Sequence, residues 1–122
     1  MNGVLAMIDT ATLLEKKCRP LESALSDAAI AEHRTAVPEW ALQNGKIARS
    51  FSFKNYYETM AFVNALAYLS HAEDHHPELA VTYNRCTVKY DTHSVNGGRG
   101  GISENDFICA AKVDALAQQG AK

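Results

Sequence analysis

The sequence predicts a single α+β domain in which an antiparallel sheet of about four strands carries about three helices on one face. The chain has 122 residues, of which 47% are hydrophobic and 21% charged, and this suffices for one domain with its own core. The hydrophobic period changes along the chain in the order helix, two strands, helix, strands, helix. Too few strands alternate singly with helices for a doubly wound parallel sheet, so an antiparallel sheet covered by helices is favoured.

The first part of the chain lacks a sustained hydrophobic period. Residues 1–24 are therefore expected to form an N-terminal arm, and residues 25–122 the folded domain. The arm is polar around residues 16–19 and then reaches Pro20, a helix breaker. A first helix is expected from Asp27, with Ser26 as its N-cap, and Pro38 ends it.

An alternating pattern predicts a β-hairpin after this helix. One strand is expected over residues 40–43 and the next over residues 46–53, because Asn44-Gly45 is a preferred two-residue hairpin turn. The large side chains of the second strand share one face, although Arg49 is an unusual member of that set. Residues 55–73 then form the strongest predicted helix, with a wide apolar face that would lie against a sheet.

The last third of the chain returns to strand-like residues before a final helix. Residues 79–93 are rich in β-branched and aromatic side chains and are expected to bend near Asn84-Arg85. Residues 94–101 hold four of the seven glycines and are expected to form a mobile loop. Ser103 is the expected N-cap of a helix over residues 104–118.

Charge and cysteine content exclude several classes of protein. Lys and Arg total 12 against 14 Asp and Glu, and a net charge of -2 argues against a chain that grips nucleic acid or an anionic membrane. The three cysteines are widely spaced without a Cys-x-x-Cys pair, so free thiols in a reducing compartment are expected. The opening residues do not resemble a signal peptide, and no apolar run is long enough for a membrane span. We therefore expect a soluble cytoplasmic protein.

A cluster of histidines is the clearest sign of chemistry. Four of the five, His71, His75, His76 and His93, fall within one stretch, and histidine exchanges protons near neutral pH. One interpretation is proton transfer without a metal. The other is a zinc site with His71, His75 and His93 as ligands and an open fourth position. His71 and His75 are four residues apart, which would put them on one helix face if the helix extends that far, but the glutamate of His-Glu-x-x-His is absent.

The motif around these histidines resembles that of the pterin-4a-carbinolamine dehydratases. The similarity extends over about residues 25–118. Its central part runs through His71, His75-His76-Pro77, Tyr83-Asn84, Thr92-His93, Gly101-Ile102-Ser103 and Asp106, and upstream segments that match are Pro38-Glu39-Trp40, Phe51-Ser52-Phe53-Lys54 and Met60-Ala61-Phe62-Val63.

The resemblance implies a lyase that dehydrates 4a-hydroxytetrahydropterin to quinonoid dihydropterin in tetrahydrobiopterin recycling, with neither metal nor organic cofactor. It implies that His75 and His93 form the acid–base pair, in an order that the sequence leaves open, and that His76 binds or orients the pterin. Asp106 and His71 would support substrate binding, and Trp40 would either pack near the pterin or belong to the core.

The resemblance also implies partners. A homodimer or homotetramer is expected, because family members oligomerise and the sheet edges of a small domain need covering. Animal members of this family also act as dimerisation cofactors of a homeodomain transcription factor. A protein-binding module is therefore one alternative to the enzyme, and a three-histidine zinc hydrolase is the other. The presence of His75, His76 and His93 favours the enzyme.

Overall fold

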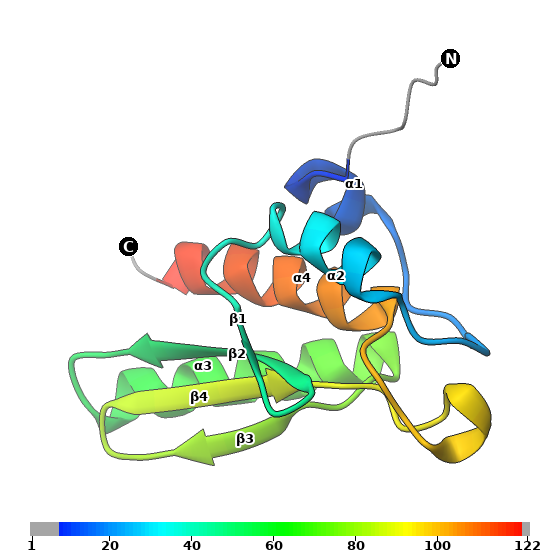
Figure 1. Ribbon diagram of the computed structural model, residues 1–122. Coiled ribbons are helices and arrows are strands. Elements are labelled where there is room, and N and C mark those ends of the chain that lie inside the picture. The colour runs from blue at the N-terminus through cyan, green and yellow to red at the C-terminus, as the bar shows by residue number, and fades with distance from the viewer. Residues whose placement is uncertain (1–7, 121–122) are drawn as a thin grey trace.

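The computed structural model describes residues 8–120 and has a sheet layer and a helix layer (Figure 1). Four strands form one antiparallel sheet in the order β1-β2-β4-β3. Helix α3 packs against the sheet and α4, while α1 and α2 pack on α4. This arrangement confirms the predicted α+β class. The strands are β1 (Ala41–Gln43), β2 (Lys46–Ser52), β3 (Glu78–Val81) and β4 (Arg85–Tyr90), and the helices are α1 (Thr10–Glu15), α2 (Asp27–Arg34), α3 (Tyr56–Glu73), the 3-10 turn η1 (Asn96–Gly98) and α4 (Glu104–Gly120).

The predicted hairpin forms between β1 and β2. Asn44 and Gly45 both adopt positive φ, 50° and 77°, as a two-residue turn of the favoured hairpin type requires. The turn sets the register, which pairs Gln43 with Lys46. Arg49 does share the core-facing side of β2, and its guanidinium is used there: it lies 4.5 Å from the centre of the Phe51 ring and donates to Asp114 of α4 at 2.8 Å.

The strand-like stretch after α3 divides into β3 and β4, with a turn close to the predicted bend. Strand β4 is central and its core-facing residues Cys86, Val88 and Tyr90 are fully buried. Among residues 8–120, strand β3 pairs only with β4, and all four residues of β3 are exposed. Leu79 and Val81 pair with Val88 and Cys86 in register, yet they stay exposed because β3 is the edge of the sheet.

Helix α3 begins and ends through identifiable contacts. The side chain of Asn55 caps it by accepting a hydrogen bond from the Glu58 N–H. The helix stops at Glu73 because Asp74 adopts the left-handed conformation, with φ 51° and ψ 43°. His75 therefore lies beyond the helix, and the condition under which His71 and His75 would share a helix face is not met.

Part of the expected N-terminal arm is folded. Helix α1 packs on α4 and buries Leu13 completely in the core. Residues 1–7 of the predicted arm lie outside the described residues. Within residues 8–120, no helix combines the length and the apolar character needed to cross a membrane.

Candidate active site

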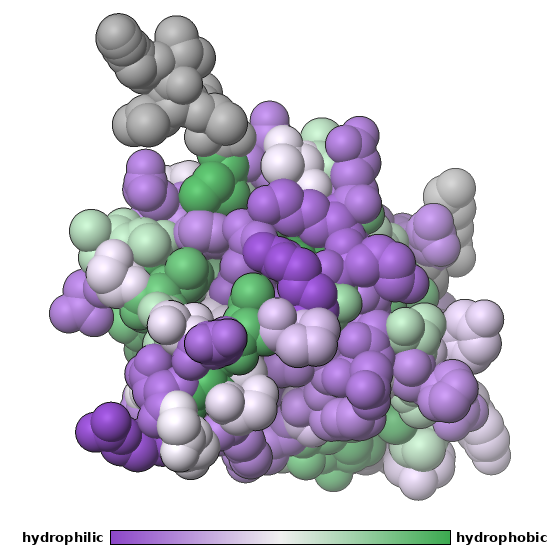
Figure 2. Space-filling view, turned by 90° about the vertical axis from the view of Figure 1, so that its right-hand side faces the viewer, coloured by the Kyte–Doolittle hydropathy of each residue, from purple (hydrophilic) through white to green (hydrophobic). Residues whose placement is uncertain are grey.

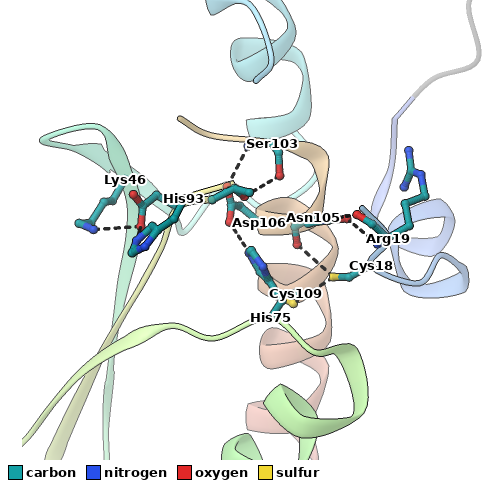
Figure 3. Close-up of polar contacts among 11 residues, drawn as sticks. Cys18, Arg19, Lys46, His75, His93, Ser103, Asn105, Asp106 and Cys109 are labelled. Atoms are coloured by element: carbon teal, nitrogen blue, oxygen red, sulfur yellow. Dashed lines mark hydrogen bonds and ion pairs between the residues drawn. The ribbon is translucent and has the colours of Figure 1, made fainter. Parts of the chain in front are cut away.

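The carboxylate of Asp106 connects the segments that carry the predicted site (Figure 3). Asp106 is fully buried in the first turn of α4. Its Oδ1 lies 2.6 Å from Nε2 of His75, and its Oδ2 accepts hydrogen bonds from the Thr92 hydroxyl at 3.0 Å and the Ser103 N–H at 2.8 Å. One side chain thus joins the start of α4, the loop after α3 and the segment after β4.

The start of α4 explains why an acidic residue is stable at this buried position. The first N–H groups of a helix lack partners within the helix, and the helix dipole favours negative charge there. Ser103 stands immediately before α4, as predicted, but its hydroxyl bonds the Thr92 hydroxyl at 2.6 Å, while its N–H donates to Asp106. At the start of this helix the Asp106 carboxylate accepts from the Ser103 N–H, whereas the prediction had the serine hydroxyl as the capping acceptor.

His75 is held on two sides. Its ring lies parallel to that of Tyr90, with ring centroids 5.6 Å apart and an interplanar angle of 6°, and only 12% of its side chain is exposed. The carboxylate of Asp106 at Nε2 holds the ring in one orientation and keeps a proton on that nitrogen. Nδ1 is then the nitrogen that can exchange a proton with a ligand.

The other predicted histidines are more exposed than His75. The side chain of His93 is 86% exposed and its Nε2 lies 3.4 Å from Oδ1 of Asp91, an oxygen that also accepts from Lys46 at 3.0 Å. This hydrogen bond raises the pKa of Lys46. His76 is exposed, with Nε2 4.0 Å from Asp74, and His71 is exposed in the last turn of α3. The backbone nevertheless brings His93 close to the centre of the site, because Thr92, its neighbour, bonds Asp106.

Trp40 belongs to the core. It is fully buried, its indole N–H donates to Asp114 at 2.8 Å, and its ring centre lies 6.0 Å from that of Tyr90. Burial raises the pKa of Asp114, although the hydrogen bonds from Trp40 and Arg49 act in the opposite direction. Of the two predicted roles of Trp40, the structure supports core packing, because a fully buried ring has no surface to offer a ligand.

A cavity of about 270 Å³ lies beside His75. This volume is close to the lower end of the roughly 300–1,000 Å³ typical of small-molecule sites. The cavity lies toward the end of the molecule that carries η1 and the arm, where hydrophilic side chains predominate on the surface (Figure 2). The other residues that line it are Cys18, Arg19, Pro20, Glu73, Asp74, Thr92, Ser94 and Asn105.

The arm forms one wall of this cavity, which the sequence analysis missed. The side-chain amide of Asn105 donates to the carbonyl of Arg19 at 2.7 Å, and the Arg19 N–H donates back to Asn105 at 3.2 Å. The N–H of Cys18 donates to the buried carboxylate of Glu73 at 2.9 Å. Cys18 and Glu73 are 55 positions apart in the chain, and Arg19 and Asn105 are 86 positions apart. The one sequence signal for docking is the basic run at residues 16–19 in a chain of negative net charge.

Two carboxylates anchor the arm electrostatically. Burial by itself would raise the pKa of Glu104. Hydrogen bonds from His33, Lys16 and Arg19 outweigh this effect and lower the pKa of Glu104 to about 2. Burial also opposes the charge of Glu73, and hydrogen bonds from Lys112 and the Cys18 N–H lower its pKa overall. Both groups are therefore ionised at neutral pH and hold the arm on α3 and α4.

The zinc interpretation requires His71, His75 and His93 to meet. Among residues 8–120, no group of three His, Cys, Asp or Glu side chains is placed to hold a metal ion. Instead, His75 faces Asp106 (Figure 3). Nε2 of His93 lies 3.4 Å from Oδ1 of Asp91. The three histidines of the zinc interpretation are therefore not brought together in the described part of the chain.

Comparison with known proteins gives one family. The family model described as pterin 4 alpha carbinolamine dehydratase matches residues 23–116. A protein of Bdellovibrio bacteriovorus is 60% identical over 111 residues, which are 91% of this chain and 92% of that protein. One of Nitrosomonas eutropha is 49% identical over 114 residues, 90% of this chain and 97% of the relative. Both carry the provisional name pterin-4-alpha-carbinolamine dehydratase.

Two solved structures are similar to the fold. A Brucella melitensis protein described as a transcriptional coactivator/pterin dehydratase aligns with a TM-score of 0.71 and 32% identity, over 78% of this chain and 99% of that chain. A pterin dehydratase-like protein, described as a RuBisCO assembly factor in the alpha-carboxysome, aligns with a TM-score of 0.52 and 28% identity, over 64% of this chain and 86% of that chain.

Proposed function

The chain belongs to the pterin 4 alpha carbinolamine dehydratase family, and from this premise we propose that it dehydrates 4a-hydroxytetrahydropterin to quinonoid dihydropterin, as tetrahydrobiopterin recycling requires. The observation that carries the proposal is the hydrogen-bonded pair of His75 and Asp106 beside a cavity of about 270 Å³. An oriented imidazole at a cavity is the minimum that an acid–base dehydration needs.

The reaction requires one base and one acid. The base removes the hydrogen on N5, and the electron pair of that N–H bond forms the double bond between N5 and C4a. The acid protonates the 4a-hydroxyl, which leaves with the electron pair of the C4a–O bond as water. One proton is taken and one is given, so the two groups exchange protonation states and solvent resets them.

The surroundings of the two histidines favour His75 as the base. The imidazolium that forms when Nδ1 takes a proton is stabilised by the Asp106 carboxylate 2.6 Å from Nε2. His93 faces Asp91 at 3.4 Å, a carboxylate that Lys46 also contacts at 3.0 Å, and we assign His93 the role of the acid. Thr92 and Ser94 on either side of His93 line the cavity, and its exposed side chain is free to turn toward a ligand there.

The remaining predicted residues have supporting roles in this proposal. His76 follows His75 and is exposed, so we assign it to binding the pterin. Asp106 orients His75, and His71 at the end of α3 contributes to the surroundings of the site. Trp40 supports the site only through the core, by packing on Tyr90.

The direct test is turnover of synthetic 4a-hydroxytetrahydropterin by the purified protein, with the spontaneous dehydration subtracted. We expect turnover above background that survives a strong chelator, is lost in His75→Ala and is kept in Gln43→Ala, an exposed control in β1. If chelation abolishes activity and zinc restores it, the reaction depends on a metal and the acid–base proposal is wrong. If the intact protein gives no turnover above background, the dehydratase proposal itself is wrong.

A protein-binding role is the second candidate, since the Brucella melitensis structure is described as a coactivator as well as a dehydratase. Tyr57 and Tyr68 on α3 are 83% and 75% exposed and offer an aromatic surface.

Homo-oligomerisation is proposed from the exposed edge strand β3. Sedimentation at micromolar concentration tests it: we expect a dimer or tetramer, and a single species of 13.3 kDa would contradict this expectation.

A further inference from the structure

Two thiols from opposite ends of the chain meet beside the cavity. The sulfur of Cys18, in the arm, lies 3.4 Å from the sulfur of Cys109, in α4, and 91 positions separate the two residues (Figure 3). Cys18 is half-buried and lines the cavity, whereas Cys109 is fully buried. Cys109 lies three residues after Asp106, one turn further along the same helix.

The backbone holds both sulfurs in place. Cys18 is fixed by its N–H bond to Glu73, and the next residue, Arg19, makes two hydrogen bonds to Asn105. The Cys18 sulfur also lies 3.6 Å from the carbonyl oxygen of Asn105, on the helix that carries Cys109. The sulfurs need to approach by roughly 1.4 Å to reach the S–S bond length of about 2.05 Å. Rotations about the side-chain bonds supply a movement of that size.

We propose that Cys18 and Cys109 are a reversible oxidation site of the folded protein, which takes a hydroperoxide as oxidant and forms a Cys18–Cys109 disulfide. The Cys18 thiolate attacks the peroxide, the O–O bond breaks, and a sulfenic acid and one molecule of water or alcohol result. The Cys109 sulfur then attacks the sulfenic sulfur, the S–O bond breaks, and the departing hydroxide takes the thiol proton as water. Each peroxide gains two electrons, and the two thiols lose them.

The surroundings of the two sulfurs decide the order of attack. The hydrogen bond with Cys18 and burial raise the pKa of the Cys109 thiol, so Cys109 keeps its proton and acts second. Cys18 lines the cavity, so it is the sulfur that a hydroperoxide reaches first. Burial raises the pKa of Cys86 as well, and this thiol lies within the core on β4. Cys86 is therefore an internal control.

The disulfide changes how the cavity wall is held. In the dithiol form, hydrogen bonds and ion pairs hold residues 16–20 on α3 and α4. In the disulfide form, a covalent bond joins this wall to the helix that carries Asp106. The cross-link also closes a long loop between residues 18 and 109, which restricts the unfolded chain and stabilises the fold.

The test treats the reduced, full-length protein with stoichiometric hydrogen peroxide. We expect a mass loss of two hydrogens, a linked peptide pair that contains Cys18 and Cys109, and slower amide exchange over residues 16–20. We also expect an unfolding midpoint higher by roughly 5–15 °C, which dithiothreitol reverses. Cys86→Ala should show the same midpoint shift, and Cys18→Ser should show none.

Three outcomes overturn the proposal. Both thiols remain open to alkylation after oxidation, or Cys18 accumulates as sulfinic acid without a link, or Cys86 appears in the cross-link. Peptide mapping of the unmodified sequence decides among these outcomes without any substitution in the core. The result of the peptide mapping does not depend on whether the protein is a dehydratase, because no pterin is present in the experiment.

Discussion

The ring of His75 lies flat against the ring of Tyr90, with centroids 5.6 Å apart and planes within 6° of parallel. Tyr90 is the last residue of β4 and is fully buried, and Trp40 packs against it at 6.0 Å between centroids. The orientation of His75 is therefore supported by the hydrophobic core as well as by Asp106. We expect a substitution in the core next to Tyr90 to alter the orientation of His75, because Tyr90 contacts both the core and His75.

The hydroxyl of Tyr90 gives the first prediction. Among the described residues this buried group has no hydrogen bond of ordinary geometry, and the Cys109 thiol beside it is a weak partner. Burial raises the pKa of Tyr90, so the hydroxyl stays neutral. We expect Tyr90→Phe to raise the free energy of unfolding by about 1 kcal/mol, because it removes an unsatisfied polar group and keeps the ring. Urea denaturation measures the change.

The same variant should turn over the pterin within about threefold of the unmodified protein, since the ring that supports His75 remains. Tyr90→Leu, the control, removes the ring and should lower both stability and turnover. A loss of more than 1 kcal/mol in Tyr90→Phe contradicts the prediction and indicates that the hydroxyl is bonded.

The two proposed acid–base histidines give the second prediction. We expect His75→Ala and His93→Ala each to lower the turnover number by about 10²–10⁴-fold, the usual range of a general acid–base contribution. The double variant should cost less than the product of the two, because either loss already disables the pair. His76→Ala should raise KM more than it lowers kcat. Single variants that stay near the unmodified rate show that the histidine cluster has a structural role only.

Asp106→Asn tests the orientation of His75. The amide keeps the size of the carboxylate but not its charge, and its NH2 group cannot accept from Nε2, so the ring of His75 is held less firmly in one orientation. We expect a 10–100-fold or larger loss in kcat, as for other carboxylates that orient a functional histidine. NMR of the ring nitrogens of His75 shows which nitrogen carries the proton in each protein. A kcat and a proton position that are both unchanged in Asp106→Asn mean that the contact does not control His75.

The pH dependence of stability follows from Glu104. Its pKa is lowered from 4.5 to about 2 in the folded protein, so its contribution is complete above about pH 4.5 and disappears as the pH falls toward 2. We expect Glu104→Gln to cost about 1–2 kcal/mol at pH 7, allowing for partial solvent screening of the ion pairs. The difference in unfolding free energy between the two proteins should shrink steadily below pH 4.5. A difference that is constant from pH 7 to pH 3 excludes this assignment.

Trp40 separates a core role from a substrate role. Trp40→Phe removes the indole N–H bond to Asp114 and leaves a void in the core, so we expect a loss of about 2–3 kcal/mol in unfolding free energy. KM should change less than threefold. A large rise in KM at unchanged stability contradicts the core assignment and returns Trp40 to the binding site.

The parts of the fold that depend on neighbouring residues were predictable from the sequence. Asn44-Gly45 requires a tight hairpin, and Ser26 caps the helix that follows it. The end of α3 at Glu73 also agrees with the predicted range of 55–73. Asp74 ends the helix in a left-handed conformation that its residue type tolerates.

The long-range contacts of the site were not predictable from one sequence. Asn105 binds the backbone of Arg19, which is 86 positions away in the chain. Local sequence patterns do not predict a contact between residues so far apart. The cavity wall formed by the arm was missed for this reason. The family resemblance named both His75 and Asp106 as site residues, but it did not predict their pairing. Hydrophobic periodicity says nothing about contacts between a loop and the start of a helix.

The two oxygens of Asp106 have consequences for how relatives evolve. One oxygen faces His75, while the other holds Thr92 and Ser103 at the start of α4, so natural selection acts on this residue for folding as well as for chemistry. A descendant that lost dehydration and kept only a binding role would still be selected to retain the aspartate. Loss of activity in a lineage should therefore appear first at His75 or His93, which make fewer contacts, and an intact Asp106 is no evidence of turnover.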